Sequence, residues 1–361
     1  MKKVNLRKQI IIATPIDPNN FGNRMQNYAV HEICKKLGFE PVSLIAPKQC
    51  KRILVLSFFR IFRKYIILLK IPRITKLNKM LNGWNFTIKN INTKFAWNEK
   101  YINAYVKQSI GAGIGGDQIW SYYWSNIVTF CEFPTIDPKN KICFAPSIGS
   151  DKLTCKEKSS LKSKINNIDK IAVREDTAVP IITELTGKIP QVIIDPVLML
   201  NVSEWQKIQG DIGIKKDYAL VYCLGHGKQS QKIKDLTAYH SLIIKNIMDI
   251  NNPELYSSSP QQFLTLIENS RVVFTDSYHG VLFSLLYNIP VVLINRIGEN
   301  GETMNTRFDQ IVNKYNLSSR YLDIVNCQTL FDIPVEFSAQ IENERNKAWS
   351  YYINIVEKMI K

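Results

Sequence analysis

The chain has 361 residues, of which 45% are hydrophobic, and carries a formal net charge of +16. This length and composition predict an ordinary globular protein, with two domains expected rather than one. The seven cysteines form no C-x-x-C pair and no zinc-like cluster with the four histidines, so we expect reduced thiols in a cytoplasm and no metal site. The opening apolar run, Ile10 to Ala13, is too short for a signal-peptide core, and no run reaches the length of a spanning helix.

The first elements are typical of an α/β domain. An apolar strand at Ile10 to Thr14 is followed by the loop PIDPNNFGN and by a helix from about Arg24 to Leu37, whose apolar residues share one face. Gly38 is a plausible end for this helix, and Pro41 to Ile45 forms a second predicted strand.

The next segment carries most of the excess positive charge. No Asp or Glu occurs between Pro41 and Asn98, and we predict a basic, apolar helical insertion over about residues 48–80. The segment Lys51 to Lys70 has two alternative interpretations. It lies on the anionic inner face of the cytoplasmic membrane, where each basic residue contributes about 1 kcal/mol, or it is a solvated helix that covers the core. No recognised nucleic-acid motif accompanies the charge, so we expect no nucleic-acid partner.

The rest of the chain repeats the alternation of short apolar runs and helical stretches, which predicts parallel sheets covered on both faces. The predicted strands are Ile142 to Ala145, Lys170 to Val173, Gln191 to Ile194, Tyr218 to Cys223, Arg271 to Thr275 and Pro290 to Ile294, and the helices include Asp176 to Leu185 and Gln261 to Ser270. DPVLML, Asp195 to Leu200, with the polar sequence after it, is the predicted hinge between residues 1–200 and 201–340. A final helix over 341–361 is expected to pack back on the first domain.

The segment RVVFTDSYHGVLFSLLYNIPVVLINR, Arg271 to Arg296, is the most informative. A strand ends near Phe274, the polar turn TDSYHG follows, and a helix is expected from about Val281. This places the turn at the C-terminal edge of a parallel sheet and at a helix N-terminus, where anionic ligands bind. His279 can exchange a proton near neutral pH, with Asp276 or Ser277 to orient it. The alternative is an ordinary capping turn with a structural histidine.

TDSYHG, followed by VLFSLLYNIPVV, resembles the T-D-S-[FY]-H-G signature of the polysaccharide pyruvyl transferase family. Further stretches occur in that family's order, from Asn20 to about Arg320: NFGNRMQNYAVHEICKKLGF, GGDQIW, FAPSIGS, AVREDTAVPIITELTG, IIDPVLML and TRFDQIVNKYNLSSR. The resemblance implies an α/β fold of two Rossmann-like domains that face each other across a cleft, similar to GT-B glycosyltransferases.

The resemblance also implies an activity, the transfer of a pyruvyl group from phosphoenolpyruvate onto two hydroxyls of a sugar to form a cyclic ketal. The acceptor is then expected to be a sugar linked to a lipid, such as undecaprenyl diphosphate, or to a nucleotide, in surface polysaccharide biosynthesis. Phosphoenolpyruvate is a co-substrate, and no cofactor and no metal are implied. Because the donor is a compact anion, its site needs arginine or lysine and helix N-termini.

Site residues follow from the matched motifs. His279 is the expected general acid, and Arg174 in AVREDT is expected to bind the donor, with a salt bridge to Glu175 or Asp176 as its alternative. The other expected donor residues are Arg296, Ser277, Tyr278 and Gly280. The residues expected to bind the acceptor or line the cleft are Asn20, Gly22, Asn23, Gly116, Asp117, Gln118, Ser147 and Asp276. Asp195, before a proline, is interpreted as structural.

The stretch GAGIGGDQIW also spells G-x-G-x-x-G with Gly111, Gly113 and Gly116, a weak dinucleotide signal without its usual acidic partner. In the family register Gly111 and Gly113 fall in a strand, and Gly115 and Gly116 form a tight turn that presents Asp117 and Gln118, with no nicotinamide or flavin involved. A glycosyltransferase that uses a nucleotide sugar, and a non-catalytic glycan-binding or membrane-surface protein, remain alternatives to the pyruvyltransferase.

Overall fold

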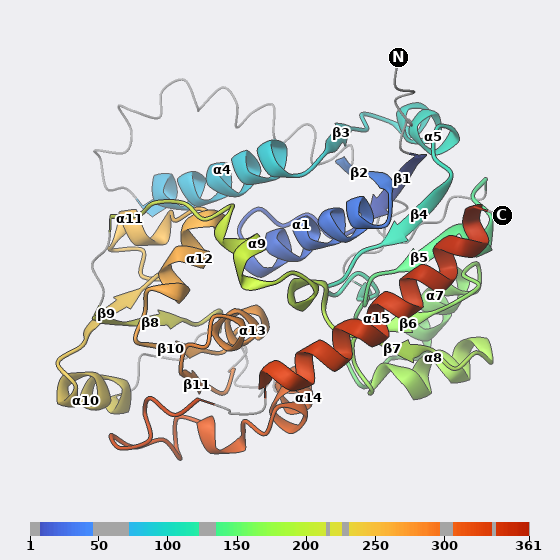
Figure 1. The fold of residues 1–361 in the computed structure, drawn as a ribbon. Helices are drawn as coiled ribbons and strands as arrows, with labels where there is room; N and C mark the ends of the chain where they lie inside the picture. Colours follow the sequence, from blue (N-terminus) through green and yellow to red (C-terminus); the bar gives the residue numbers. More distant parts are fainter. Residues whose placement is uncertain are drawn as a thin grey trace.

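Two parallel β-sheets form the framework of the protein (Figure 1). The computed structural model describes residues 8–45, 72–122, 135–213, 217–225, 231–296, 306–333 and 337–360. The predicted basic segment, Lys51 to Lys70, lies outside the described residues.

The first sheet has five parallel strands in the order β3-β2-β1-β4-β5. They are β1 (Lys8–Ala13), β2 (Phe39–Ile45), β3 (Thr93–Phe95), β4 (Gly111–Ile114) and β5 (Lys141–Cys143). Ile10 to Ala13 at the centre of the sheet are completely buried, as expected of a strand covered on both faces. Two short parallel strands, β6 (Ala172–Val173) and β7 (Gln191–Val192), pair with each other.

The second sheet has four parallel strands in the order β11-β10-β8-β9. They are β8 (Tyr218–Tyr222), β9 (Ile243–Asn246), β10 (Val272–Thr275) and β11 (Val291–Leu293). β8 and β10 form its buried centre, whereas β9 is a partly exposed edge.

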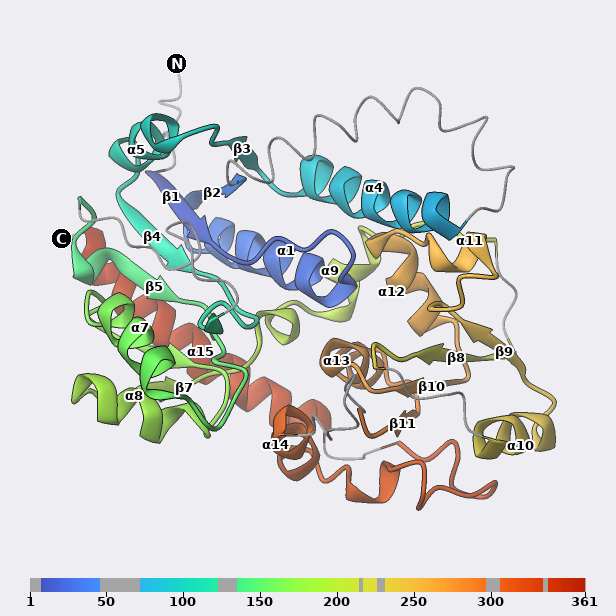
Figure 2. The same cartoon turned by 180° about the vertical axis from the view of Figure 1, so that it is seen from behind.

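Helices cover both sheets (Figures 1 and 2). The α-helices are α1 (Phe21–Lys36), α4 (Pro72–Asn90), α5 (Glu99–Lys107), α7 (Cys155–Ile165), α8 (Ala178–Thr186), α9 (Val202–Gln206), α10 (Gln231–Tyr239), α11 (Pro253–Tyr256), α12 (Pro260–Glu268), α13 (Tyr278–Leu286), α14 (Thr306–Lys314) and α15 (Phe337–Ile360). Short 3₁₀ helices are η3 (Pro138–Asn140), η4 (Pro196–Met199) and η5 (Ser318–Arg320). The parallel sheets and their helices confirm the predicted α/β class with two Rossmann-like domains.

Helix α1 joins the two domains through its buried face. The side chain of Asn20 accepts a hydrogen bond from the backbone N–H of Asn23 and so caps the helix. The ring of Phe21 stacks on Phe263 of α12, with centroids 4.8 Å apart, and Met25 belongs to the same buried cluster as Phe283 of α13. A hydrophobic core is therefore shared across the domain boundary.

The segment predicted as a hinge is packed rather than exposed. All four residues of η4 are buried, because PVLM is apolar and lies between α1 and α13. The predicted loop after it contains α9, which begins with a capping box of Asn201 and Glu204. Trp205 is completely buried and donates its indole N–H to the carbonyl of Val197 at 3.1 Å.

Helix α15 returns from the second domain to the first (Figure 1). It begins at Phe337, four residues before the predicted start at Ile341. Its Tyr352 ring lies 5.1 Å from that of Phe144, next to β5, and Tyr351 donates its hydroxyl hydrogen to the carbonyl of Lys170 at 3.2 Å. The end of the chain thus packs on the first domain.

Candidate active site between the two domains

The turn between β10 and α13 presents the signature residues at the domain boundary. Ser277 is the N-cap of α13, and its Oγ accepts a hydrogen bond from the N–H of Gly280 at 3.4 Å. The helix therefore begins at Tyr278, three residues before the predicted Val281, and His279 lies in its first turn. A Cβ on Gly280 would lie 2.6 Å from Oγ1 of Thr275, so this position requires glycine.

Three ionisable side chains meet beside this turn. Nη1 of Arg174 lies 3.0 Å from Oδ2 of Asp195, and Nε2 of His279 lies 3.7 Å from the same oxygen. Arg174 follows β6, Asp195 precedes η4, and His279 comes from α13. The side chains are only 4%, 1% and 8% exposed respectively, so both domains contribute to one buried charged cluster.

Arg174 and Asp195 stay charged although they are buried, because each stabilises the charge of the other. Burial alone would raise the pKa of Asp195, but His279, Arg174 and the backbone N–H of Val197 lower this pKa to about 2. Burial would likewise lower the pKa of Arg174, but Tyr278, Asp195 and Glu175 raise it above its usual value. At neutral pH the arginine and the aspartate are both charged.

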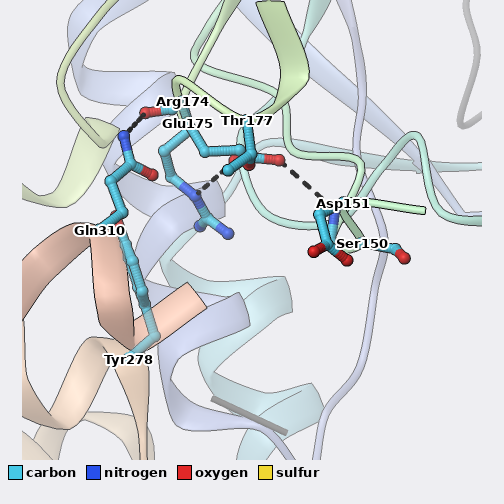
Figure 3. Close-up of a pocket in the computed structure, with 8 residues that line it drawn as sticks. Ser150, Asp151, Arg174, Glu175, Thr177, Tyr278 and Gln310 are labelled. Atoms are coloured by element: carbon cyan, nitrogen blue, oxygen red, sulfur yellow. Dashed lines mark hydrogen bonds and ion pairs between the residues drawn. The ribbon is translucent and has the colours of Figure 1, made fainter. Parts of the chain in front are cut away.

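Arg174 also lines a pocket at the domain boundary (Figure 3). The centre of its guanidinium lies 4.2 Å from the ring centroid of Tyr278, a cation–π contact. Its Nε lies 3.6 Å from Glu175, and its carbonyl accepts a hydrogen bond from Gln310 of α14 at 3.3 Å. The pocket is lined by Gly149, Ser150, Asp151, Arg174, Glu175, Thr177, Tyr278 and Gln310.

Helix α1 closes the other side of His279. A Cβ on Gly22 would lie 2.3 Å from Nδ1 of the imidazole, so glycine is needed for this close approach. Asn20 caps the helix. The structure thus places Gly22 of the first domain directly against the predicted general acid of the second, with Asn20 two residues away in the chain.

The remaining acceptor candidates of the first domain form a second group. Nδ2 of Asn23 donates to Oδ2 of Asp117 at 2.8 Å, and the backbone N–H of Ser147 donates to the carbonyl of Asp117 at 2.8 Å. Asp117 has a φ of 61°, an uncommon conformation for a residue other than glycine. A Cβ on Gly116 would approach Gln26, and one on Gly149 would clash with Gln118, so both glycines permit close packing.

Asp276 and Arg296 hold the loop that follows β8. Asp276 accepts hydrogen bonds from the backbone N–H groups of Leu224 and Gly225 at 2.6 and 2.7 Å, one to each carboxylate oxygen. Arg296 donates to the carbonyl of Asp276 at 2.9 Å. Asp276 was predicted to line the acceptor site, but here its carboxylate fixes the backbone of its own sheet edge. Arg296 belongs to the same group, since its Nη2 also lies 3.6 Å from Oδ1 of Asp276.

The glycines of the G-x-G-x-x-G pattern have different surroundings. Gly111 and Gly113 lie within β4, and a Cβ on Gly113 would lie 2.7 Å from atoms of Ile12 and Phe144. They leave room for the neighbouring strand and core, and only Gly116 lies near the candidate site. The pattern is thus a coincidence of sheet packing.

The geometry adds two residues to the candidate site that the sequence analysis did not assign to it. Asp195 was interpreted as structural, yet it contacts both Arg174 and His279. Gln310 lies in TRFDQ and bridges α14 to the carbonyl of Arg174 and the carboxylate of Asp176. The order of the family motifs, which includes both IIDPVLML and TRFDQ, is the signal that could have found them.

Within the described residues, no helix is long and apolar enough to cross a membrane. The same residues contain no group of three or more histidine, cysteine, aspartate or glutamate side chains arranged to hold a metal ion.

The fold and the site define a two-domain α/β protein with a charged pocket between its Rossmann-like units. The sequence model of the family described as polysaccharide pyruvyl transferase matches residues 20–297, most of the chain. The protein therefore belongs to the polysaccharide pyruvyl transferase family and is a pyruvyl transferase of polysaccharide biosynthesis in this general sense.

Other comparisons are more distant. A search of curated protein sequences found no match. Among solved structures, the UDP-N-acetylglucosamine 2-epimerase from Rickettsia bellii is 9% identical with a TM-score of 0.34, and each chain is covered over 98% of its length. The glycotransferase of kitacinnamycin is 10% identical with a TM-score of 0.36, over 98% of this chain and 99% of that one.

Proposed function

We propose that this protein transfers the pyruvyl group of phosphoenolpyruvate onto two hydroxyls of one sugar and forms a cyclic ketal. The proposal rests on family membership and, within the structure, on one observation: the buried contact of Arg174 and His279 with Asp195 at the domain boundary. An anionic donor needs a fixed cation, and its reaction needs an acid beside it.

The residues have separate roles in this proposal. Arg174 binds the carboxylate or phosphate of phosphoenolpyruvate, and Tyr278 holds the guanidinium plane at 4.2 Å. His279 is the general acid. Asp195 has no contact with the substrate in this proposal, but it pairs with Arg174 and lies 3.7 Å from Nε2 of His279, so it is a positioning residue.

The reaction balances with these groups. A proton passes from His279 to C3 of phosphoenolpyruvate, and C2 becomes electrophilic. One sugar hydroxyl adds to C2 and loses its proton, and inorganic phosphate leaves with the C2–O bonding electrons. The second hydroxyl then bonds to C2 and loses its proton, which closes the ketal. One proton is consumed at C3 and two are released from the hydroxyls, and the leaving phosphate accepts protons from the site according to pH.

Release of inorganic phosphate tests this function. The protein is incubated with phosphoenolpyruvate and a panel of lipid-linked and nucleotide-linked sugars, and products are examined for the mass of a pyruvyl ketal. We expect phosphate release that depends on an acceptor, and its loss in Arg174→Ala and His279→Ala. Arg271→Ala and His240→Ala are matched controls, because Arg271 is 55% exposed and His240 bonds the carbonyl of Cys327 in the second domain.

Full activity in both Arg174→Ala and His279→Ala would exclude these residues. Binding of nucleotide sugars without binding of phosphoenolpyruvate, measured by calorimetry, would instead support a glycosyltransferase. Glycan binding without turnover under any donor would support a non-catalytic protein.

We also propose that the protein acts in the cytoplasm at the inner face of the membrane, where Lys51 to Lys70 contacts anionic lipid. The proposal rests on the basic, apolar sequence of that segment. Co-sedimentation with vesicles containing phosphatidylglycerol is expected, and it should be lost when Arg60, Arg63 and Lys64 are replaced by glutamine. Equal sedimentation of that variant would contradict the proposal.

A further inference from the structure

A groove of about 720 Å³ continues from the pocket that Arg174 lines. The two share Asp151, Thr177 and Gln310 among the residues that line them, so the groove opens directly from the candidate site. Its volume is within the range of small-molecule sites. It runs past the start of α8 to the helices α14 and α15, beyond the residues that the sequence assigned to the acceptor.

The two ends of the groove carry opposite charges. Asp151 and Asp176 lie at the end near Arg174, with Gln310 donating to Asp176 at 3.3 Å. At the far end, Nζ of Lys314 lies 2.6 Å from Glu344 and Nζ of Lys347 lies 3.3 Å from the same carboxylate. Two lysines share one glutamate there, and this end has a net positive charge.

The lysine end retains the capacity to bind an anion. The side chain of Lys347 is 57% exposed, and an ammonium has three donors, of which one points to Glu344. Lys314 is 29% exposed and is fixed between α14 and α15 by its ion pair. A phosphate group near both lysines would gain charge-assisted hydrogen bonds.

The opposite end suits a sugar. Carboxylate and amide oxygens accept hydrogen bonds from hydroxyls, and Asp151, Asp176, Gln310 and Asn313 present such groups along the groove. The same carboxylates repel a phosphate. A sugar that carries a phosphate would therefore orient in one direction, with its hydroxyls toward Arg174 and its phosphate toward Lys347.

We infer that this groove binds the acceptor as a sugar diphosphate, with the diphosphate held by Lys314 and Lys347 and the sugar directed into the pocket beside Tyr278. The inference rests on the proposed function for the direction of the sugar. The diphosphate site itself depends only on the groove and its charges. Nucleotide-linked and lipid-linked sugars share this diphosphate chemistry.

Lysine reactivity tests the site without turnover. The full chain is acetylated with and without inorganic pyrophosphate, uridine diphosphate or farnesyl diphosphate, and each lysine is quantified by mass spectrometry. We expect pyrophosphate to protect Lys347 several-fold while Lys234, an exposed lysine of α10, is unchanged. Protection by uridine diphosphate alone assigns a nucleotide-linked acceptor, and protection by farnesyl diphosphate alone assigns a lipid-linked one.

Variants provide the second measurement. Lys347→Ala and Lys347→Glu should weaken calorimetric binding of the protecting diphosphate by about tenfold or more, because a charge-assisted hydrogen bond is lost. Lys234→Ala is the matched control, and the KM for phosphoenolpyruvate should stay the same in all three variants. Thermal melting checks that each variant folds.

The outcomes separate the two proposals. Protection of Lys347 without phosphate release from phosphoenolpyruvate leaves the diphosphate site standing and overturns the proposed function. Acceptor-dependent phosphate release, with no protection of Lys347 by any of the three probes and unchanged affinity in Lys347→Glu, overturns the diphosphate site alone.

Discussion

Arg174 and Lys79 are both buried cations at the boundary between the two domains, but their surroundings differ. Arg174 contacts the carboxylates of Asp195 and Glu175. Lys79 of α4 is only 4% exposed, and its Nζ lies 4.7 and 4.9 Å from the ring centroids of Phe21 and Tyr256 and 3.2 Å from the sulfur of Met248.

The difference indicates that the neighbours of a buried cation decide whether its pKa rises or falls on folding. Both groups lose hydration on folding. The pKa of Arg174 nevertheless rises, because Tyr278, Asp195 and Glu175 outweigh burial. Burial lowers the pKa of Lys79 to about 8, and the opposing effect of Asp17 is too weak to restore it. The buried cluster of Arg174, Asp195 and His279 can hold an anion, whereas Lys79 is a weakly compensated charge that contacts side chains of both domains.

Removal of the shared counterion should have the largest effect. Asp195→Asn leaves the buried Arg174 without its carboxylate partner, and breaking a buried ion pair from one side costs about 3–5 kcal/mol. We expect the free energy of unfolding at pH 7 to fall by that amount and phosphate release to fall at least about 100-fold. Urea denaturation and a turnover assay measure the two effects.

Asp217→Asn is the matched control for that prediction, since Asp217 pairs with Arg271 at 3.5 Å on the surface, where the two side chains are 74% and 55% exposed. The control should change stability by less than about 1 kcal/mol. If Asp195→Asn changed the free energy of unfolding equally little, Arg174 would need no counterion.

Lys79→Met should act in the opposite direction. The pKa of Lys79 falls from 10.5 to about 8 on folding, so the unfolded chain binds more protons between these values and stability rises as the pH increases from 8 to 10.5. Removing the charge should raise the free energy of unfolding at pH 7 by about 2 kcal/mol, after the loss of the cation–π contacts.

The variant should also lose the rise in stability between pH 8 and 10, which urea denaturation at several pH values measures. Lys76→Met, at an exposed position of the same helix, should keep that rise. Destabilisation of Lys79→Met at pH 7 would show that the two rings and the sulfur compensate the ammonium as well as carboxylates do.

Lowering the pH should weaken the buried cluster of Arg174, Asp195 and His279 before it affects Lys79. The pKa of Asp195 is lowered from 3.8 to about 2 on folding, by His279, Arg174 and the Val197 N–H against the effect of burial. Its stabilising contribution, about 2 kcal/mol, is complete above pH 4 and is lost as the pH falls toward 2. Asp195→Asn should therefore have a shallower acid dependence than the wild type in denaturation at pH 5, 4 and 3.

The smallest effect is expected at an exposed ion pair. Lys158 and Glu184 lie 2.8 Å apart, with side chains 34% and 59% exposed. Surface pairs of this kind contribute about 0–1 kcal/mol. Lys158→Met should change the melting temperature by no more than a few degrees, and 0.5 M salt should abolish the difference. A loss as large as that in Asp195→Asn would remove the distinction between paired charges inside and outside the protein.

The sequence predicted the regular elements that have strong local signals. β1 contains the apolar run Ile10 to Ala13, β10 begins with the apolar run Val272 to Phe274, and α12 has a serine N-cap followed by proline. Their patterns are therefore visible without tertiary contacts. β9 was not predicted because it is an exposed edge strand with only two apolar residues among its four. The start of α13 was missed because Ser277 caps a helix whose first turn reads as a polar loop.

Site residues could be predicted from the sequence only where they lie in a family motif. His279 and Arg174 follow from TDSYHG and AVREDT, but their separation in the chain says nothing of their shared contact with Asp195. A buried aspartate before proline looks structural in sequence, because the charges around it come from two other segments. For Asp276 the sequence shows a carboxylate at the sheet edge, but not that this carboxylate accepts hydrogen bonds from two backbone N–H groups.

Helix α15 has a mechanical consequence. The chain crosses between the domains near η4 and returns through α15, and Arg345 of α15 donates hydrogen bonds to the carbonyls of Leu198 and Leu200 at 2.6 and 3.1 Å. These bonds connect α15, which returns to the first domain, to the segment at η4, where the chain leaves that domain. The two places where the chain crosses between the domains are thereby joined, and the domains cannot separate at this point without breaking both hydrogen bonds.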